Sequence, residues 1–294
     1  MLAWSLRMYR FFRRHPLTEE APARALRRAL AWQVASRICP FDMLMPWTGG
    51  TRLVMRRGMT GATGNWYTGL HEYQDMGFIL HLLRPDDLFF DVGANIGSYT
   101  VLAAGAAGAE VMSVEPGDDA RAVLAANVRV NDLSGRVQIS DEGVAATDGV
   151  AYFTSGLDTL NHLADGPGPG TVEIKVRSLD SLAEGRVPVA IKMDVEGGEF
   201  DALTGAAGLL GNPDLKALIL ELNDLVTASG HSKQEIYDLL AGHGFEPCGY
   251  DPKARTVKTA DRTRSENVIF LRDRDFITAR VQEAPTFTIL GQQI

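Results

Sequence analysis

Short apolar runs alternate with amphipathic stretches along most of the chain from residue 88 onwards. Runs such as Leu88–Val92 and Ala217–Leu222 are typical of buried strands, and the amphipathic stretches between them are typical of helices. The predicted strands are 88–92, 110–115, 136–140, 189–194, 217–222, 245–250 and 267–271, and the main predicted helices are 98–107, 118–130, 199–210 and 233–241. This alternation predicts an α/β fold with a mostly parallel, doubly wound sheet, and an antiparallel pair at its edge formed by the last two strands.

The first 69 residues follow a different pattern. Trp4, Met8, Phe11 and Phe12 lie at helical spacing among arginines, which predicts one or two basic helices in residues 1–45. Glycine, threonine and aromatic residues dominate 47–68, which predicts a hairpin and a loop that lead into a helix near 70–83. We therefore expect a basic helical arm and hairpin region at 1–69, an α/β domain at 70–275 and a tail at 276–294.

Charge separates the arm from the rest of the chain. Residues 1–37 hold eight arginines and two acids, which is a charge of +6. Because the whole chain has a net charge of −8, the remaining residues carry −14. Such an acidic body does not favour nucleic-acid binding, which requires clustered cations. The arm itself could contact an anionic membrane surface, bind a partner in a biosynthetic complex, or pack on the main domain with its arginines in solvent.

The sequence shows no sign of export or of a membrane span. No apolar run reaches the roughly 18 residues that a span requires, and arginines interrupt the apolar N-terminal stretch, which has no signal-cleavage pattern. Cys39 and Cys248 have neither metal-ligand nor disulfide spacing. We expect a cytoplasmic protein, with a peripheral position at the inner face of the membrane as the alternative.

A glycine turn follows the first strand of the α/β domain. In Asp91-Val-Gly93-Ala-Asn95-Ile-Gly97, the glycines allow close approach of a ligand and the next helix offers free backbone N–H groups. A carboxylate at Asp91 would repel a pyrophosphate but attract a cationic amino group. Asn95 also breaks the G-x-G-x-x-G spacing of dinucleotide sites. The turn therefore favours S-adenosylmethionine over NAD.

Acids also follow the second and third strands. Glu115 ends the second strand, where a carboxylate can accept hydrogen bonds from ribose hydroxyls, a feature that NAD and S-adenosylmethionine proteins share. Glu142 follows the third strand and could accept a hydrogen bond from an adenine amino group, or belong to a solvated acidic loop.

A second acidic cluster, Lys192-Met-Asp-Val-Glu-Gly-Gly-Glu199, ends the fourth strand beside the topological switch point. One of its carboxylates, at Asp194 or Glu196, could take a proton from a substrate hydroxyl. Alternatively, Asp194, Glu221 and Asn223 could bind a divalent cation such as Mg²⁺. His162 is another candidate base or a solvated loop residue, and Glu196 and Glu199 could instead cap the following helix.

These residues resemble the FkbM family of methyltransferases. The matching stretches are Asp91–Thr100 (DVGANIGSYT), Val114–Pro116, the pair Asn127 and Asn131, Ser178–Leu182, Ile191–Glu199 (IKMDVEGGE) and Leu220–Asn223, within about residues 70–272. Gly198, where a small residue such as alanine is common, is a departure. The resemblance implies a seven-stranded class I methyltransferase fold in the α/β domain. It also implies S-adenosylmethionine-dependent transfer to oxygen, usually on sugars, glycans or polyketide-type natural products.

The resemblance assigns roles to the candidate residues. It implies that Asp91, Gly93, Asn95, Gly97 and Glu115 bind the cofactor, with Ser98 and Pro116 in the same matching stretches, and that Asp194 and Glu196 lie at the reaction centre. Two other functions stay open at this point: an NAD-dependent sugar oxidoreductase, and a non-catalytic cofactor-binding partner of a biosynthetic complex. The sequence does not identify the acceptor or the oligomeric state.

Overall fold

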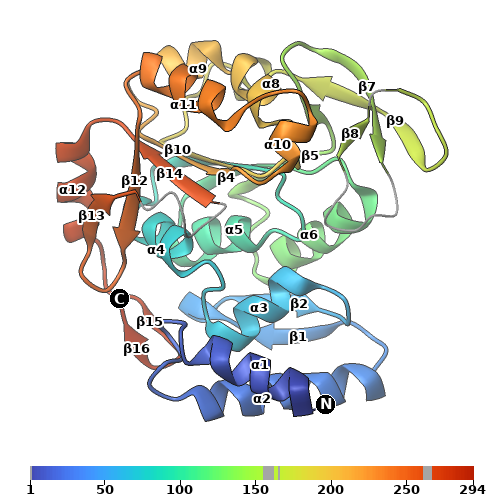
Figure 1. Cartoon of the computed structure of the whole chain (residues 1–294), viewed down its shortest axis with the longest axis vertical. Coiled ribbons are helices and arrows are strands. Elements are labelled where there is room, and N and C mark those ends of the chain that lie inside the picture. The colour runs from blue at the N-terminus through green and yellow to red at the C-terminus, as the bar shows by residue number, and fades with distance from the viewer. Residues whose placement is uncertain (1, 155–161, 165, 261–266) are drawn as a thin grey trace.

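The computed structural model describes residues 2–154, 162–164, 166–260 and 267–294. A sheet with the strand order β13-β12-β14-β11-β10-β3-β4-β5 forms the centre of the molecule (Figure 1). Its strands are β3 (Leu88–Val92), β4 (Glu110–Val114), β5 (Val137–Ser140), β10 (Ala190–Met193), β11 (Ala217–Glu221), β12 (Glu246–Asp251), β13 (Thr256–Thr259) and β14 (Asn267–Leu271). The order reverses between β3 and β10, which makes this junction the switch point where doubly wound sheets bind ligands.

The end of the sheet that contains β11, β14, β12 and β13 differs from the prediction in two ways. The described sheet has eight strands rather than seven, because β13 folds back on β12 after a turn in which Asp251 accepts a hydrogen bond from the amide of Ala254. In addition, the antiparallel strand β14 lies inside the sheet, between β11 and β12, and not at its edge. The predicted antiparallel pairing of the last two predicted strands, β12 and β14, is confirmed.

Helices cover both faces of the sheet, as predicted. Side chains alternate between two apolar cores, so that Phe89 and Ile219 pack on one face, and Phe90 and Leu220 on the other. The first face carries α4 (Tyr73–Leu82), α5 (Ser98–Val101), η2 (Leu102–Ala107), α6 (Asp118–Val130) and α12 (Arg274–Gln282). The second carries α7 (Leu179–Ala183), α8 (Glu199–Thr204), α9 (Ala207–Gly211), α10 (Leu225–Ala228) and α11 (Lys233–Gly242).

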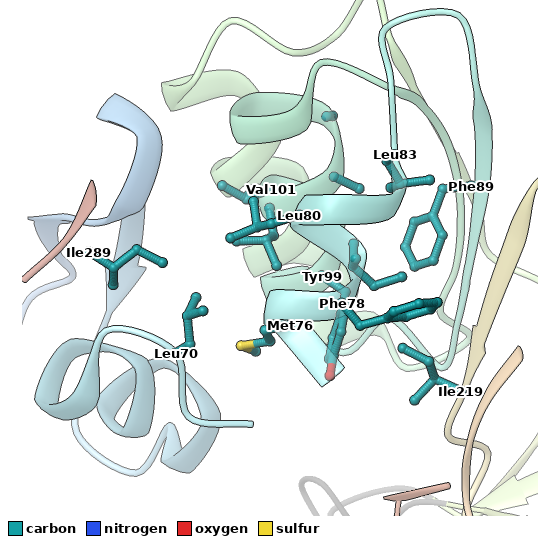
Figure 2. Close-up of a cluster of buried hydrophobic side chains, with 14 of the residues drawn as sticks. Leu70, Met76, Phe78, Leu80, Leu83, Phe89, Tyr99, Val101, Ile219 and Ile289 are labelled. Carbon is teal, nitrogen blue, oxygen red and sulfur yellow. The ribbon is translucent and has the colours of Figure 1, made fainter. Parts of the chain in front are cut away.

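The N-terminal segment shares the core of the first face. It contains α1 (Leu2–Phe12), α2 (Pro22–Ile38), β1 (Met43–Pro46), η1 (Thr48–Gly50), β2 (Arg52–Met55) and α3 (Thr60–Thr68). Phe12 and Trp32 are buried in the same cluster as Phe89, and Figure 2 shows Leu70 and Met76 continuing this cluster towards the sheet. The C-terminal pair β15 (Thr288–Ile289) and β16 (Gln292–Gln293) reaches the same segment, since Gln292 donates a hydrogen bond to the carbonyl of Leu17.

The chain between β5 and β10 forms a second, smaller sheet. Its order is β6-β9-β7-β8, with β6 (Gly143–Val144), β7 (Gly149–Thr154), β8 (Leu163–Ala164) and β9 (Thr171–Arg177). β7 and β9 pair antiparallel and form the centre of this sheet. Over the described residues, no helix has both the length and the apolar character that crossing a membrane would require.

Candidate active site

A row of polar side chains crosses the carboxyl edge of the sheet. Asp91 lies opposite Ser113 on β4 and Lys192 on β10, on the face covered by α4 and α5. Side chains two positions apart in a strand face the same way. The positions that follow Ser113, Lys192 and Ile219 by two therefore place Glu115, Asp194 and Glu221 on this face, at the ends of their strands. The predicted site residues from three separate strands therefore lie along one edge of the sheet, on both sides of the switch point.

The glycine turn fits closely against the end of β10. Gly93 has a φ of +73°, and a Cβ atom at this position would lie 1.8 Å from the carbonyl oxygen of Asp194. Gly97 has a φ of +82°, and its Cβ would lie 2.3 Å from Leu124 Cδ1. Both positions therefore require glycine for conformation and for space. The turn thus joins β3, the first strand of the α/β domain, directly to α5.

Glu115 fixes this turn through both carboxylate oxygens. Its Oε2 accepts a hydrogen bond from the amide of Asn95 at 2.7 Å, and its Oε1 accepts one from the amide of Gly117 at 2.8 Å. Burial raises the pKa of Glu115, and these two amide hydrogen bonds oppose that rise. A carboxylate accepts about four hydrogen bonds, so Glu115 retains acceptor positions for a ligand.

Asp91 lies beneath the turn and is only 2% exposed. Thr100 on α5 donates a hydrogen bond to its Oδ2 at 2.5 Å, and the Thr100 hydroxyl also contacts Ser113 at 2.8 Å. Burial raises the pKa of Asp91 to about 6, while the Thr100 hydrogen bond and Lys192 oppose the rise. Asp91 thus ties α5 to the central strands in addition to any role in binding.

Lys192 is a buried ammonium surrounded by acids. Its Nζ lies 3.5 Å from Asp194 Oδ2 and 5.6 Å from the centre of the Tyr99 ring. Burial by itself lowers the pKa of Lys192, but Asp194, Glu72 and Glu221 raise it above its ordinary value. Lys192 therefore remains charged and compensates the carboxylates of the edge.

Acids from the start of α4 complete this network. The Tyr99 hydroxyl donates a hydrogen bond to Glu72 Oε2 at 2.6 Å, and Asn267 Nδ2 donates one to Asp75 Oδ2 at 3.2 Å. Burial, followed by the charge of Glu72, raises the pKa of Asp75 to about 7. The site therefore includes residues from α4 as well as from the strand ends.

Asp194 and Glu221 form a close carboxyl pair. Burial and the neighbouring Asp194 raise the pKa of Glu221 well above its ordinary range, so Glu221 is the protonated member of the pair near neutral pH. Hydrogen bonding between the two groups contributes to this rise, so the Glu221 carboxyl donates to the Asp194 carboxylate, whose buried Oδ1 atom has no other donor among the described residues.

Glu196 lies above this pair in an uncommon backbone conformation, with a φ of +52°. Asn223 Nδ2 donates a hydrogen bond to Glu196 Oε2 at 3.3 Å. Burial and the charge of Asp194 raise the pKa of Glu196 to about 7, and nearby His162 opposes the rise. The structure thus brings together the three predicted catalytic residues, Asp194, Glu196 and His162.

Glu199 has a different role from its acidic neighbours. Its Oε1 accepts hydrogen bonds from the amides of Val195 at 3.1 Å and Gly197 at 3.3 Å, at the start of α8. Neither acid caps α8 with its side chain: Glu199 binds amides of the loop that precedes the helix, and Glu196 turns towards Asn223.

The remaining cofactor candidates lie around the turn. Ser98 and Pro116 are half-buried beside Gly97 and Glu115. Glu142 lies 3.8 Å from Arg177 Nη1 and accepts a hydrogen bond from the Ser140 hydroxyl at 3.3 Å. Because Glu142 already has these partners, its predicted contact with an adenine amino group would have to share the carboxylate.

The structure does not support the predicted Mg²⁺ site at Asp194, Glu221 and Asn223. Among the residues that the structure describes, no three histidine, cysteine or acidic side chains come together in a group that could hold a metal ion. The physical reason is that Lys192 lies beside Asp194 as its cation, while Asn223 donates to Glu196 and accepts from the amide of Leu225.

Sequence reasoning missed four members of the site: Lys192, Glu72, Asp75 and Tyr99. A signal existed for Lys192, because residues two apart in a strand face the same way and Lys192 precedes Asp194 by two. No comparable signal existed for Glu72 and Asp75, which reach the site only through the packing of α4 on the sheet.

Comparisons with known proteins find relatives among the methyltransferases. A family model described as the methyltransferase FkbM domain matches residues 91–247. The hexuronic acid methyltransferase AglP of Haloferax volcanii is 27% identical over 208 residues, which cover 69% of this chain and 74% of that protein. The 31-O-demethyl-FK506 methyltransferase FkbM of Streptomyces tacrolimicus is 33% identical over 198 residues, which cover 55% of this chain and 74% of that protein.

A solved structure, methyltransferase FkbM from Methylobacillus flagellatus, is similar with a TM-score of 0.45 and 17% identity. The similarity covers 85% of this chain but only 60% of that one. The family model matches more than half of the chain, and the protein belongs to the FkbM family of methyltransferases.

Proposed function

We propose that the protein transfers the methyl group of S-adenosylmethionine to a hydroxyl group of a sugar, a glycan or a related natural product. Family membership supports methyl transfer. Two relatives support the acceptor class, since one is named as a methyltransferase of hexuronic acid and the other as a methyltransferase of 31-O-demethyl-FK506. The observation that carries the proposal is the carboxylate set at the switch point, with Glu196 at its centre.

The charges of the site suit S-adenosylmethionine better than NAD. Asp91, Glu115 and Asp194 surround the glycine turn, where a pyrophosphate would be repelled but an ammonium and a sulfonium would be attracted. Glu115 would accept hydrogen bonds from the ribose through the lone pairs that the amides of Asn95 and Gly117 leave free. When bound there, S-adenosylmethionine supplies an electrophilic methyl group.

Glu196 is the proposed general base. A carboxyl with a pKa of about 7 is partly ionised at neutral pH and is basic enough to accept a proton from a hydroxyl group in the transition state. Asn223 orients the carboxyl through its hydrogen bond to Oε2. The uncommon φ of Glu196 projects it from the end of β10, and such local strain is typical of functional positions.

Lys192 and Asp194 are proposed to position the acceptor. The Lys192 ammonium and the Glu221 carboxyl hold the Asp194 carboxylate in place, and its remaining lone pairs can accept a hydrogen bond from a substrate hydroxyl. Methyl transfer depends strongly on the alignment of nucleophile, methyl carbon and sulfur, so a rigid carboxylate has more value here than a mobile one.

Calorimetric titration with S-adenosylhomocysteine, combined with a turnover assay, tests the proposal. We expect the chain to bind S-adenosylhomocysteine and not NAD, and Glu115→Gln to weaken this binding at least about tenfold, since hydrogen bonds to a charged group contribute about 1.5–3 kcal/mol. Glu196→Gln should keep the affinity and lower kcat for a hexuronic acid glycoside by about 10²–10⁴.

The pH profile and a control variant complete this experiment. Because the pKa of Glu196 is about 7, kcat/KM should rise with pH up to about 7 and then level off, and Glu196→Gln should lose this rise. Glu246→Gln, an exposed carboxyl on β12, should behave like the wild type. NAD binding as tight as that of S-adenosylhomocysteine, or full turnover by Glu196→Gln, would contradict the proposal.

A further inference from the structure

Large apolar side chains are exposed mainly in one part of the molecule. Of the ten that the described residues expose most, seven lie in the first 44 residues. These are Leu6, Tyr9, Phe11, Val34, Ile38, Phe41 and Leu44. Ile38 is 77% exposed and Phe41 is 75% exposed, at the point where α2 ends and the chain enters β1. Isolated exposed apolar residues are ordinary, but such a concentration indicates a contact surface.

Arginines accompany these apolar side chains. Arg7 and Arg10 are exposed on the side of α1 away from buried Phe12, and Arg14 is exposed just after the end of this helix. Arg24 and Arg27 are exposed on α2. With two acids against eight arginines in residues 1–37, this surface is strongly positive.

The N-terminal arm, of which the structure describes residues 2–69, is a fixed part of the fold. α1 buries Phe12, and α2 buries Ala25, Ala29 and Trp32 in the core shared with the sheet. Figure 1 shows α1 and α2 together at the end of the molecule opposite α8, α9 and α11. The exposed faces of the two helices are therefore held in place without a covering element from the described chain.

A groove lies within the same region. It has a volume of about 250 Å³ and runs between α2, β1 and α3. Trp32, Met43, Met45 and Trp66 line it, with Arg27 and Arg28 among its lining residues. Tryptophan and arginine together are typical of the interface between lipid headgroups and acyl chains.

We propose that the exposed faces of α1 and α2, with the start of β1, bind the surface of an anionic lipid bilayer. The arginines would contact lipid phosphates, while Ile38 and Phe41 would enter the boundary between headgroups and acyl chains. A nucleic-acid surface would not need these apolar side chains, and charge complementarity favours an anionic bilayer over an uncharged partner. The inference is independent of the acceptor and of the cofactor.

Vesicle co-sedimentation of the full chain tests this inference. We expect binding to vesicles of phosphatidylglycerol and phosphatidylcholine, little binding to phosphatidylcholine alone, and a decrease with added salt. Each arginine near an anionic surface contributes about fivefold to the partition coefficient. The triple variant Arg7→Glu, Arg10→Glu, Arg14→Glu should therefore bind at least about 100-fold more weakly.

A second variant and a matched control separate the two contributions. Ile38→Ser with Phe41→Ser should weaken binding at all salt concentrations, because it removes insertion and no charge. The control triple Arg129→Glu, Lys175→Glu, Lys253→Glu makes the same change in net charge with exposed residues outside the arm and should keep most of the binding.

Three results would overturn the inference. They are equal binding to neutral and anionic vesicles, an equal loss in the arm triple and the control triple, and a dimer, measured by analytical ultracentrifugation, that the arm variants abolish. Circular dichroism of each variant establishes that the fold is retained, which is expected because every substituted side chain is exposed.

Discussion

At the carboxyl edge of the sheet, Asp75, Asp91 and Lys192 are each less than a tenth exposed, whereas Arg7 and Arg10 on α1 face solvent. Burial of a charge is costly unless partners compensate it, and a buried ionic network is often no more stable than an apolar core of the same shape. The edge therefore holds its charges for binding and chemistry. The arm holds its charges at little cost to stability, where they remain available to a partner.

Lys192→Met should give the largest change in the free energy of unfolding. The substitution leaves Asp194, Glu72 and Glu221 around a neutral side chain, and removal of one partner from a buried ionic network typically costs about 3–5 kcal/mol. Urea unfolding measures this loss.

The matched change on the arm is Arg10→Met, which should alter the free energy of unfolding by less than about 0.5 kcal/mol because the side chain is exposed. Lys216→Met is an intermediate control, since Lys216 Nζ lies 2.7 Å from the largely solvated Asp273. Equal losses for Lys192→Met and Arg10→Met would mean that the buried network contributes nothing particular to stability.

The apolar pattern predicted most of the central sheet because each central strand buries both faces. β3, β10 and β11 begin and end within one or two residues of the prediction. Where local pattern and tertiary contacts disagreed, the prediction was wrong. The predicted helix 199–210 is broken between α8 and α9 because Gly205 packs against the backbone of Ala145, only 2.3 Å from where a Cβ would lie.

Other elements had no periodic signal. α3 contains two glycines and reads as a loop, but it is held by packing of Ala62 and Tyr67 and by the Asn65 side chain, which accepts a hydrogen bond from the amide of His71. For the site, strand ends and glycines indicated the acids at the switch point. Glu72 and Asp75 could not be predicted, because their position depends on how α4 crosses the sheet.

The pH dependence of stability provides a second test of the buried edge. The pKa of Asp75 is raised in the folded protein to about 7, so folding favours the protonated carboxyl. The contribution of Asp75 to the free energy of unfolding is fully present below the pKa of this group in the unfolded chain. It is lost as the pH rises to about 7. From about pH 5 to pH 8, Asp75 should contribute a loss of about 2.7 kcal/mol, two pH units at about 1.36 kcal/mol each.

Asp75→Asn should remove this contribution, so its free energy of unfolding should fall less between these two pH values than that of the wild type. Arg10→Met on the arm should keep the wild-type slope. A slope unchanged by Asp75→Asn would show that Asp75 does not bind its proton in the folded state.

The last and smallest expected effect concerns the link between the two regions. Asn127 on α6 is completely buried; its Oδ1 accepts a hydrogen bond from the amide of Val54 on β2 and its Nδ2 donates one to the carbonyl of Ile96. Asn127→Ala leaves two buried backbone groups without partners, which should cost about 2 kcal/mol and increase hydrogen exchange at Val54. Asn131 binds the amide and the carbonyl of Arg52 in the same manner but is half-buried, so Asn131→Ala should cost about 1 kcal/mol or less because water can replace the lost groups. Equal costs for the two variants would mean that burial does not determine the strength of this link, and that the arm is joined to the sheet mainly by its apolar core.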